Sequence, residues 1–224
     1  MTQQFDTLRG VLDARHSCRA FLPDPVEEEV IARIVSAAGR APSWCNAQPW
    51  QVTVTRGAET GRFRTALLEA VETDTPQPHL PWPERYPGAH GARRRECGLQ
   101  LYEAVGIARE DRAARAEQGM ENYRLFGAPH VAIVHSEAAL GPYGAMDTGG
   151  FVTAFMLAAT AAGVGSIAQA SVAAYAPMIR AHFDLPETRL ILCAISFGWP
   201  DAEHPANRFR TTRAALDEVL DLRG

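Results

Sequence analysis

Residues 40–50 read RAPSWCNAQPW and join two segments whose periodicity is clear. The preceding segment has the apolar spacing of a helix, and residues 51–55, QVTVT, alternate like a strand. An ordinary connection is polar and rich in glycine, whereas this one holds two tryptophans and two prolines beside a cysteine, an asparagine and a glutamine. Because proline restricts the backbone, the stretch predicts a rigid turn that holds its polar side chains in fixed positions.

The composition is that of a globular protein. The 224 residues suit a single domain spanning residues 1–224, and 46% of them are hydrophobic. The net charge of −4 argues against a nucleic-acid-binding surface, which would be basic. Lysine is absent, which excludes a lysine nucleophile or Schiff base. An anion must therefore be bound by arginine, histidine or backbone N–H groups.

Cysteine usage and hydropathy predict a cytoplasmic protein. No C-x-x-C motif or zinc-type cysteine–histidine spacing occurs, so no metal site is expected. The N-terminus lacks an apolar stretch of the signal-peptide type. The longest apolar region, residues 149–165, is shorter than the roughly 20 residues of a membrane span. Reduced thiols are expected at Cys18, Cys45, Cys97 and Cys193.

The order of elements predicts an α+β fold. Helices are expected over residues 5–14, 24–39, 63–71, 93–118, 147–162 and 175–183, and strands over 51–55, 130–135 and 189–198. Asp24 is the expected cap of the second helix, with Pro25 at its first position and Glu27 at its third. The proline-rich residues 73–91 predict an irregular excursion within the domain. No βαβ rhythm and no G-x-G-x-x-G after a strand occur, so a Rossmann site is not indicated.

Three further segments carry possible binding groups. RHSCR (15–19) offers two arginines, an imidazole and a hydroxyl to a phosphate or polyol. GVGSIAQAS (163–171) presents small residues against which a flat molecule can lie. Arg208, Arg210 and Arg213 can meet an anion near the C-terminus. Each segment also has a plainer interpretation, as a solvated turn, a helix end followed by a strand, or a solvated tail.

Taken together, these segments describe one ligand. The amides of Asn46 and Gln48 carry donors and acceptors that can read the edge of a flat heterocycle. Taken alone, the 40–50 stretch is more simply explained as a rigid, buried turn with a packed tryptophan. Combined with the arginine motifs and the small-residue segment, it indicates a planar heteroaromatic with a polyol phosphate, which is the description of flavin mononucleotide (FMN).

The chain resembles the nitroreductase family of FMN-dependent oxidoreductases. The segments that carry the resemblance are RHSCRAF (15–21), AAGRAPSWCNAQPW (37–50), DTGGFVTAFMLAATAAGVGSIAQAS (147–171) and FGWPDAEHPANRFRTTRAALDEV (197–219). The resemblance implies an α+β nitroreductase-like fold, with a mixed, mainly antiparallel sheet flanked by helices. It also implies an intertwined homodimer with FMN at the subunit interface.

The resemblance assigns a role to each motif. The first arginine of RHSCR and the C-terminal arginines would hold the phosphate, and the histidine and serine would lie along the ribityl chain. The second arginine of RHSCR would lie near flavin N1 and O2, where a cation stabilises the reduced cofactor. The proline turn would come from the other subunit, and the small-residue backbone would lie near N5. The cofactor-binding residues implied are Arg15, His16, Ser17, Arg19, Pro42, Ser43, Asn46, Ile167, Ala168, Gln169, Ala170, Arg210 and Arg213.

The activity implied by the resemblance is a ping-pong reduction. NADH or NADPH would deliver a hydride to flavin N5 and leave, and a nitroaromatic or quinone would then take the electrons. Because the chemistry belongs to the cofactor, no catalytic side chain is expected. Trp44 is a candidate wall of the substrate site, or else interface packing.

Several alternatives stay open. The same cofactor supports dehydrogenation of a heterocycle or amide, reductive dehalogenation or flavin fragmentation, and a non-catalytic flavin-binding protein is a third class. Arg109, Arg112 or Arg115 can meet the 2′-phosphate of NADPH, or simply form a solvated helix face. The nucleotide preference and the physiological acceptor are therefore not predicted.

Overall fold

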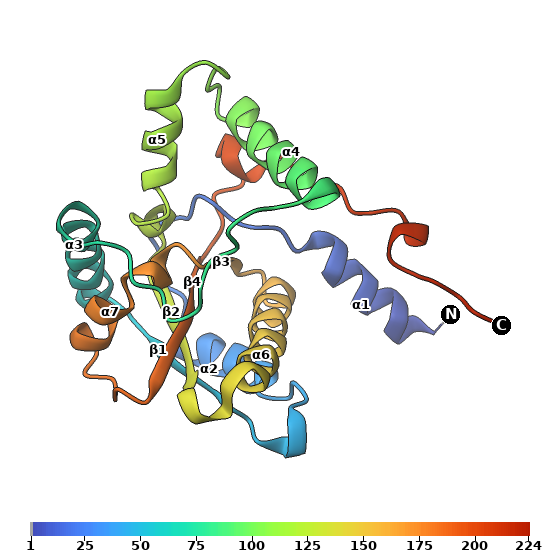
Figure 1. Ribbon diagram of the computed structural model, residues 1–224, viewed down its shortest axis with the longest axis horizontal. Coiled ribbons are helices and arrows are strands. Elements are labelled where there is room, and N and C mark those ends of the chain that lie inside the picture. The colour runs from blue at the N-terminus through green and yellow to red at the C-terminus, as the bar shows by residue number, and fades with distance from the viewer. Residues whose placement is uncertain (1) are drawn as a thin grey trace.

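The centre of the protein is an antiparallel sheet. A computed structural model describes residues 2–224. Within that range lie the strands β1 (Trp50–Val54), β2 (His130–Glu137), β3 (Gly165–Gln169) and β4 (Arg189–Gly198), in the order β1-β2-β4-β3 (Figure 1). All pairings between these strands are antiparallel, and a parallel contact occurs only at an isolated bridge to Ser17 in the described chain. The predicted α+β class with a mainly antiparallel sheet is confirmed.

Helices cover both faces of this sheet. In the described part of the chain they are α1 (Gln3–Ala14), α2 (Glu28–Ala38), α3 (Ala58–Thr73), α4 (Gly88–Ala104), α5 (Arg112–Met120), α6 (Gly141–Ala161) and α7 (Ala176–His182). The helices predicted over residues 5–14, 63–71, 147–162 and 175–183 are confirmed as α1, α3, α6 and α7, and all three predicted strands are present. None of the helices within residues 2–224 is long and apolar enough to cross a membrane.

The β2 strand separates two hydrophobic cores. Val131 and Ile133 point to the core formed with α3 and α7, whereas Ala132 and Val134 point to the core formed with α2 and α6. Successive side chains of a strand point to opposite faces, so a strand buried on both faces must be apolar at every position. This is why the centre of HVAIVH, residues 131–134, is a continuous apolar run.

The second helix begins later than predicted. Its first residue is Glu28, and Asp24 does not cap it. The backbone N–H of Val26 instead donates to Nε2 of the buried His130 at 2.9 Å, which keeps the residues before the helix extended. The N-cap residue, Glu27, makes no side-chain capping bond. A tertiary hydrogen bond thus outweighs the local capping pattern, as tertiary context commonly does.

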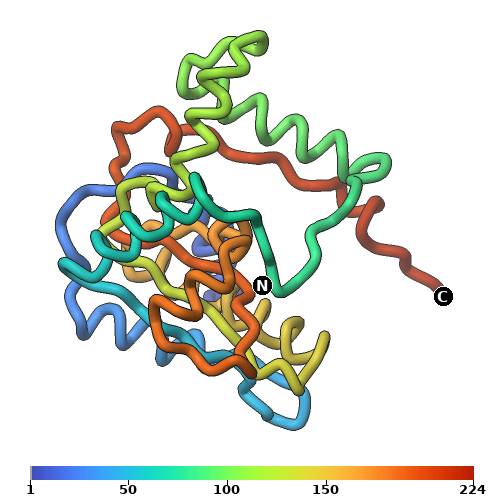
Figure 2. The backbone as a smooth tube through the Cα atoms, turned by 60° about the vertical axis from the view of Figure 1, so that its left-hand side comes forward, coloured from blue at the N-terminus to red at the C-terminus, as the bar shows by residue number. Residues whose placement is uncertain are grey.

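The single helix predicted over residues 93–118 is two helices. The chain leaves α4 at Gly106, whose φ of +71° is a left-handed conformation that favours glycine. α5 then starts anew, capped by the Asp111 carboxylate, which accepts the backbone N–H of Ala114 at 2.9 Å. α4 also begins at Gly88, so the last residues of the predicted 73–91 loop are helical. Figures 1 and 2 show α4 and α5 standing away from the sheet.

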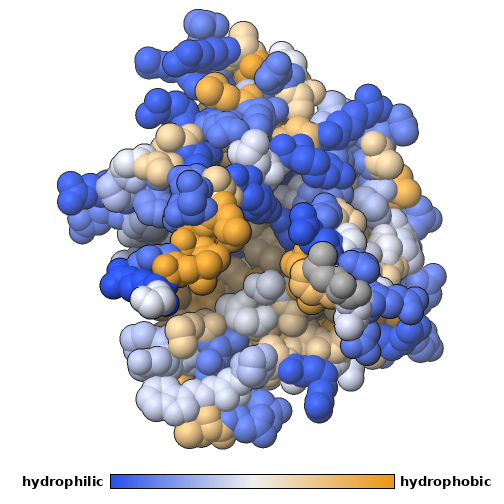
Figure 3. Space-filling view, turned by 90° about the vertical axis from the view of Figure 1, so that its right-hand side faces the viewer, coloured by the Kyte–Doolittle hydropathy of each residue, from blue (hydrophilic) through white to orange (hydrophobic). Residues whose placement is uncertain are grey.

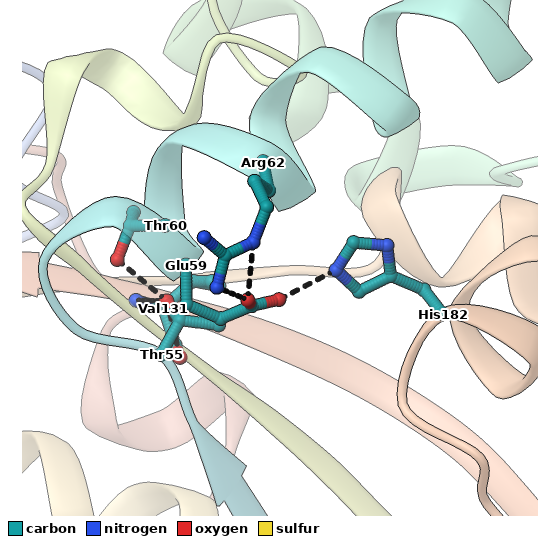
Figure 4. Close-up of polar contacts among 6 residues, drawn as sticks. All are labelled: Thr55, Glu59, Thr60, Arg62, Val131 and His182. Atoms are coloured by element: carbon teal, nitrogen blue, oxygen red, sulfur yellow. Dashed lines mark hydrogen bonds and ion pairs between the residues drawn. The ribbon is translucent and has the colours of Figure 1, made fainter.

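A polar contact joins α3 to α7 on one face of the sheet (Figure 4). Nε2 of His182 donates to the Glu59 carboxylate at 2.7 Å, and Nε of Arg62 donates to the same carboxylate at 2.8 Å. The bond from His182, and then that from Arg62, lowers the pKa of Glu59. This cluster ties two helices together far from the basic motifs.

Gly165, the first residue of β3, is the point where the N-terminal segment crosses the sheet most closely. A Cβ atom at Gly165 would lie 2.9 Å from Sγ of Cys18 and 3.1 Å from Cβ of Pro200. Those two residues belong to the segments that flank β3, and Cys18 is fully buried. Only glycine allows this approach without displacing one of the segments.

We expect Gly165→Ala to destabilise the protein by about 1–3 kcal/mol, the usual effect of overpacking. Chemical denaturation of the purified variant measures the change. Gly61→Ala is the matched control, because Gly61 lies in α3 with open space around its Cα, and this change should be neutral or stabilising by about 0.5–1 kcal/mol. Equal stabilities of the two variants would contradict the close approach.

Candidate functional site

Two basic motifs from opposite ends of the chain meet around one cavity of about 320 Å³. The segment that follows α1 and the C-terminal tail form its walls, and Cys97 of α4 also lines it. The predicted site residues that line it are Arg15, His16, Ser17, Arg19, Arg210 and Arg213.

The first motif is held in place by the edge of the sheet. Ser17 forms a parallel bridge with Ser166 of β3, and the N–H of Cys18 donates to the Ser166 carbonyl at 3.1 Å. A second bridge joins Phe21 to Pro200, just beyond β4. The chain therefore runs in extended form between β3 and the residues after β4, and this course leaves the side chains at its start, Arg15 to Ser17, and Arg19 lining the cavity.

Asn207 links this segment to the C-terminal tail. Its Oδ1 accepts the backbone N–H of Arg19 at 2.6 Å, and its Nδ2 donates to the carbonyls of Ala20 at 2.9 Å and Asp201 at 2.8 Å. The side chain is buried. It therefore satisfies three backbone groups at once and fixes where both basic motifs enter the cavity.

The cavity has a surplus of positive charge. Within residues 2–224, none of the guanidiniums of Arg15, Arg19, Arg210 and Arg213 forms an ion pair with a carboxylate. The one carboxylate that lines the cavity, on Asp13, is bonded to Arg9 at 2.9 Å. Uncompensated guanidiniums around a concave site are suited to bind a phosphate or carboxylate in bidentate fashion.

Arg15 and Arg19 are partly withdrawn from water. Burial lowers the pKa of Arg15, and the nearby charge of Arg213 lowers it further. Burial also lowers the pKa of Arg19, whose guanidinium carbon lies 5.5 Å from the centre of the Phe209 ring. Both guanidiniums stay charged at physiological pH, so an anion entering this site would meet weakly hydrated cations.

His16 is neutral in this setting. Its Nδ1 donates to the carbonyl of Ala14 at 3.1 Å, which leaves Nε2 as an acceptor. Burial lowers the pKa of the imidazole below its ordinary value, and the nearby charges, above all that of Arg210, lower it further. The Nε2 atom can thus accept a hydrogen bond from a hydroxyl group of a polyol.

Arg208 lies apart from the other C-terminal arginines. It is exposed, pairs with Glu203 at 2.8 Å and does not line the cavity. Of the basic cluster proposed from the sequence, only Arg210 and Arg213 therefore reach the site.

The edge strand β3 presents backbone and small side chains. Ala168 and Ala170 are exposed, whereas Ile167 and Gln169 are buried. The Gln169 amide is used internally: it accepts from Ser196 Oγ at 2.5 Å and donates to a backbone carbonyl at 2.7 Å. What this strand can offer a flat ligand is its backbone and two methyl groups.

The turn within residues 40–50 is rigid but lies elsewhere. The hydroxyl of Ser43 accepts the backbone N–H of Gln48 at 2.9 Å. Cys45, Asn46 and Gln48 all have φ near +50°, a conformation that costs a non-glycine residue about 1–2 kcal/mol. Such strain persists only where the surroundings impose it, and it is concentrated at functional segments.

This turn is distant from the basic cavity in the same chain. The N–H of Trp44 donates to Asp147, in the second turn of α6, at 2.9 Å. The basic cavity lies instead near the other end of α6, where the helix leads into β3. The 14 residue steps from Asp147 to Ala161 span about 21 Å at the helical rise of about 1.5 Å per residue. None of Pro42, Ser43 and Asn46 lines the arginine cavity of its own chain.

Several residues that line or support the cavity were not predicted from the sequence. Asn207 and Phe209 lie within the quoted C-terminal motif, but nothing in their spacing separated them from the arginines. Cys97 lies in the 93–118 segment, to which no contact was assigned. All four cysteines are unpaired, and no group of three or more potential metal ligands occurs in the described chain.

Asn207→Ala should destabilise the protein by about 2–4 kcal/mol, because it leaves the Arg19 N–H and two carbonyls without their partner. Chemical denaturation measures the loss. Asn207→Asp retains the acceptor for Arg19 but loses both donors, so it should not restore wild-type stability. A denaturation midpoint equal to that of the wild type would contradict this expectation and show that the Asn207 amide does not hold the two segments together.

Comparison with known proteins places the chain in a family. The model of the nitroreductase family matches residues 12–199. Nitroreductase NfnB of Mycolicibacterium smegmatis is 37% identical over 93% of this chain and 89% of its own length, and a 4-nitrobenzoate reductase of Pseudomonas putida is 32% identical over 95% and 92%. The crystal structure of the FMN-dependent nitroreductase NfnB from Mycobacterium smegmatis in complex with NADPH superposes with a TM-score of 0.93, at 35% identity over 98% of this chain and 100% of that one. The chain therefore belongs to the nitroreductase family.

Proposed function

We propose that this protein is an FMN-dependent oxidoreductase that uses NADH or NADPH to reduce nitroaromatic or quinone-type acceptors. The observation that carries the proposal is the cavity whose four guanidiniums lack carboxylate partners, beside an edge strand with small side chains. The names of the relatives agree with it, since NfnB is described as FMN-dependent and its structure holds NADPH.

The residues of the cavity fit FMN. Arg15, Arg210 and Arg213 supply the charge that a phosphate requires. His16, neutral and with a free acceptor, and the hydroxyl of Ser17 suit a ribityl chain. The β3 backbone beside them, with only methyl side chains exposed, can lie against the edge of a planar ring.

The protein's own part in the reaction is to bind, orient and polarise. Bound FMN supplies the redox chemistry, taking a hydride from the nicotinamide and passing electrons to the acceptor. Arg19, held by its backbone bond to Asn207 and by the Phe209 ring, provides a fixed cation close to the β3 edge. A fixed cation stabilises negative charge gained on reduction without reorganising in the reaction. No side chain near this edge is required as a proton donor.

We further infer a homodimer whose subunits share the site. The turn with Pro42, Ser43 and Asn46 lies too far from its own arginine cavity to contact the same ligand, so a second copy must supply it. α1 has no buried residue and exposes Phe5, Leu8 and Leu12 on one side. Figure 3 shows a hollowed face with apolar residues around it. Exposed apolar surface of this kind marks an interaction site.

The proposal extends to the location and the partners of the protein. The unpaired cysteines favour a cytoplasmic location. The net charge of −4 offers no support for a nucleic-acid partner. The partners proposed are a second copy of the chain and small aromatic acceptors.

Stopped-flow reduction tests the proposed function. We expect purified holoprotein to lose its flavin absorbance on mixing with NADH or NADPH and to recover it on mixing with a nitroarene or quinone. Separate rates for the two nucleotides give the preference. Two results would overturn the proposal and point to another flavin reaction. In the first, neither nucleotide reduces the flavin; in the second, the flavin is reduced but passes electrons to no nitroarene or quinone.

Arg15→Ala should weaken FMN binding about 30- to 150-fold, which corresponds to the 2–3 kcal/mol of a charged hydrogen bond. Fluorescence titration of the apoprotein with FMN measures this. Arg208→Ala is the matched control, because this exposed arginine pairs with Glu203 outside the cavity, and it should bind FMN like the wild type. Unchanged affinity of Arg15→Ala would remove Arg15 from the phosphate site.

A further inference from the structure

A second cavity of about 320 Å³ lies at the N-terminal end of α6. Its wall is formed by the strained turn on one side and the first turns of α6 on the other. The residues that shape it are Trp44, Cys45, Pro49, Leu140, Tyr143 and Asp147. The volume is at the lower end of the range for small-molecule sites, which suits a ligand of one or two rings.

Trp44 is exposed yet fixed in place. Its side chain is 60% accessible. The edge-to-face contact with Tyr143, at 4.5 Å between ring centres and 72° between planes, holds the indole. The bond from the Trp44 N–H to Asp147, at 2.9 Å, holds its backbone. Edge-to-face pairs of aromatic rings are favourable beyond the area that they bury. The ring is thus a preorganised flat wall.

The charge of this cavity is negative. Asp147 is the only charged side chain among the described residues that line it. The first turn of α6 adds the partial positive charge of a helix N-terminus, roughly half an elementary charge. The full negative charge of Asp147 outweighs it, and no arginine lines the wall to compensate.

We propose that this cavity is the acceptor subsite of the shared active site and that Asp147 selects against anionic acceptors. The inference rests on the proposed function, which brings the turn of residues 42–46 to the FMN of the second subunit. A neutral planar nitroarene or quinone stacks on Trp44, whereas a nitrobenzoate brings its carboxylate toward Asp147. Asp147 acts through its charge as a specificity-determining residue, and Tyr143 is a positioning residue for Trp44.

Asp147→Asn isolates the charge. The amide retains an oxygen that accepts the Trp44 N–H, so the turn keeps its hydrogen bond while the negative charge disappears. The measured quantity is kcat/KM for 4-nitrobenzoate divided by that for 4-nitrobenzamide, a neutral compound of nearly the same shape. We expect this ratio to rise about fivefold, equivalent to about 1 kcal/mol, since solvent screens a charge at an open rim.

The control removes a carboxylate elsewhere. Glu72→Gln lowers the net negative charge by the same amount on α3, where Glu72 is exposed and forms no ion pair within the described residues. Its ratio should equal that of the wild type. A ratio that rises equally in both variants would assign the effect to overall charge, and a ratio unchanged in Asp147→Asn would overturn the inference.

Variants of the aromatic pair test the wall itself. Trp44→Leu should raise KM for 4-nitrobenzamide severalfold with little change in kcat, and Trp44→Phe should restore much of the binding. Tyr143→Leu should behave like a weaker Trp44→Leu, and Tyr143→Phe like the wild type. KM values unaltered in Trp44→Leu would remove Trp44 from the acceptor subsite and overturn the aromatic wall.

Failure of this inference is distinct from failure of the proposed function. If the wild type reduces 4-nitrobenzamide and the ratio is the same in Asp147→Asn, the proposed function stands and only the subsite is overturned. If the wild type reduces neither compound and no quinone, the proposed function itself is overturned.

Discussion

The site depends on the contact between the sheet and the extended segment that follows α1. This segment bridges β3 at Ser17 and the residues after β4 at Phe21, with Cys18 fully buried between them. Without these bridges the first basic motif would be an exposed turn. With them, the N-terminal and C-terminal arginines lie on one cavity, although almost 200 residues separate them in the chain. Asn207 completes the arrangement, because it bonds to the backbone of both segments.

α6 then determines how the rest of the site must be assembled. The helix is rigid and places the basic cavity near its C-terminal end and the strained turn at its N-terminal end. A single chain therefore carries two separate groups of binding side chains with different chemistry. One gathers guanidiniums without carboxylate partners, and the other presents an aromatic wall. The proposed homodimer would join them, and it would also cover the exposed apolar side of α1.

Much of this was predictable from the sequence. The strands at HVAIVH and RLILCAISFG followed from continuous apolar runs, because a strand buried on both faces has no polar alternation. The convergence of RHSCR with Arg210 and Arg213 came from the family resemblance, since their separation in the chain conceals it. The predicted start of α2 was wrong because the backbone N–H of Val26 donates to His130, 104 positions away. No local sequence pattern reveals such a partner. The break between α4 and α5 was missed because a glycine in an otherwise helical pattern is often tolerated.

The charge distribution adds a thermodynamic link between ligand and fold. Burial and the nearby charge of Arg213 lower the pKa of Arg15, which means that gathering these cations costs free energy. The packing of Cys18 against Gly165 and the hydrogen bonds of Asn207 offset this cost, because they hold the backbone of the arginine-bearing segments in place whatever their charge. A bound phosphate would offset the repulsion between the guanidiniums. Its charged hydrogen bonds would also replace the water that the guanidiniums lose on burial. Since only the folded chain gathers these arginines, ligand binding must stabilise the fold by mass action. The constraint that builds the site is thus also the reason that its ligand reinforces it.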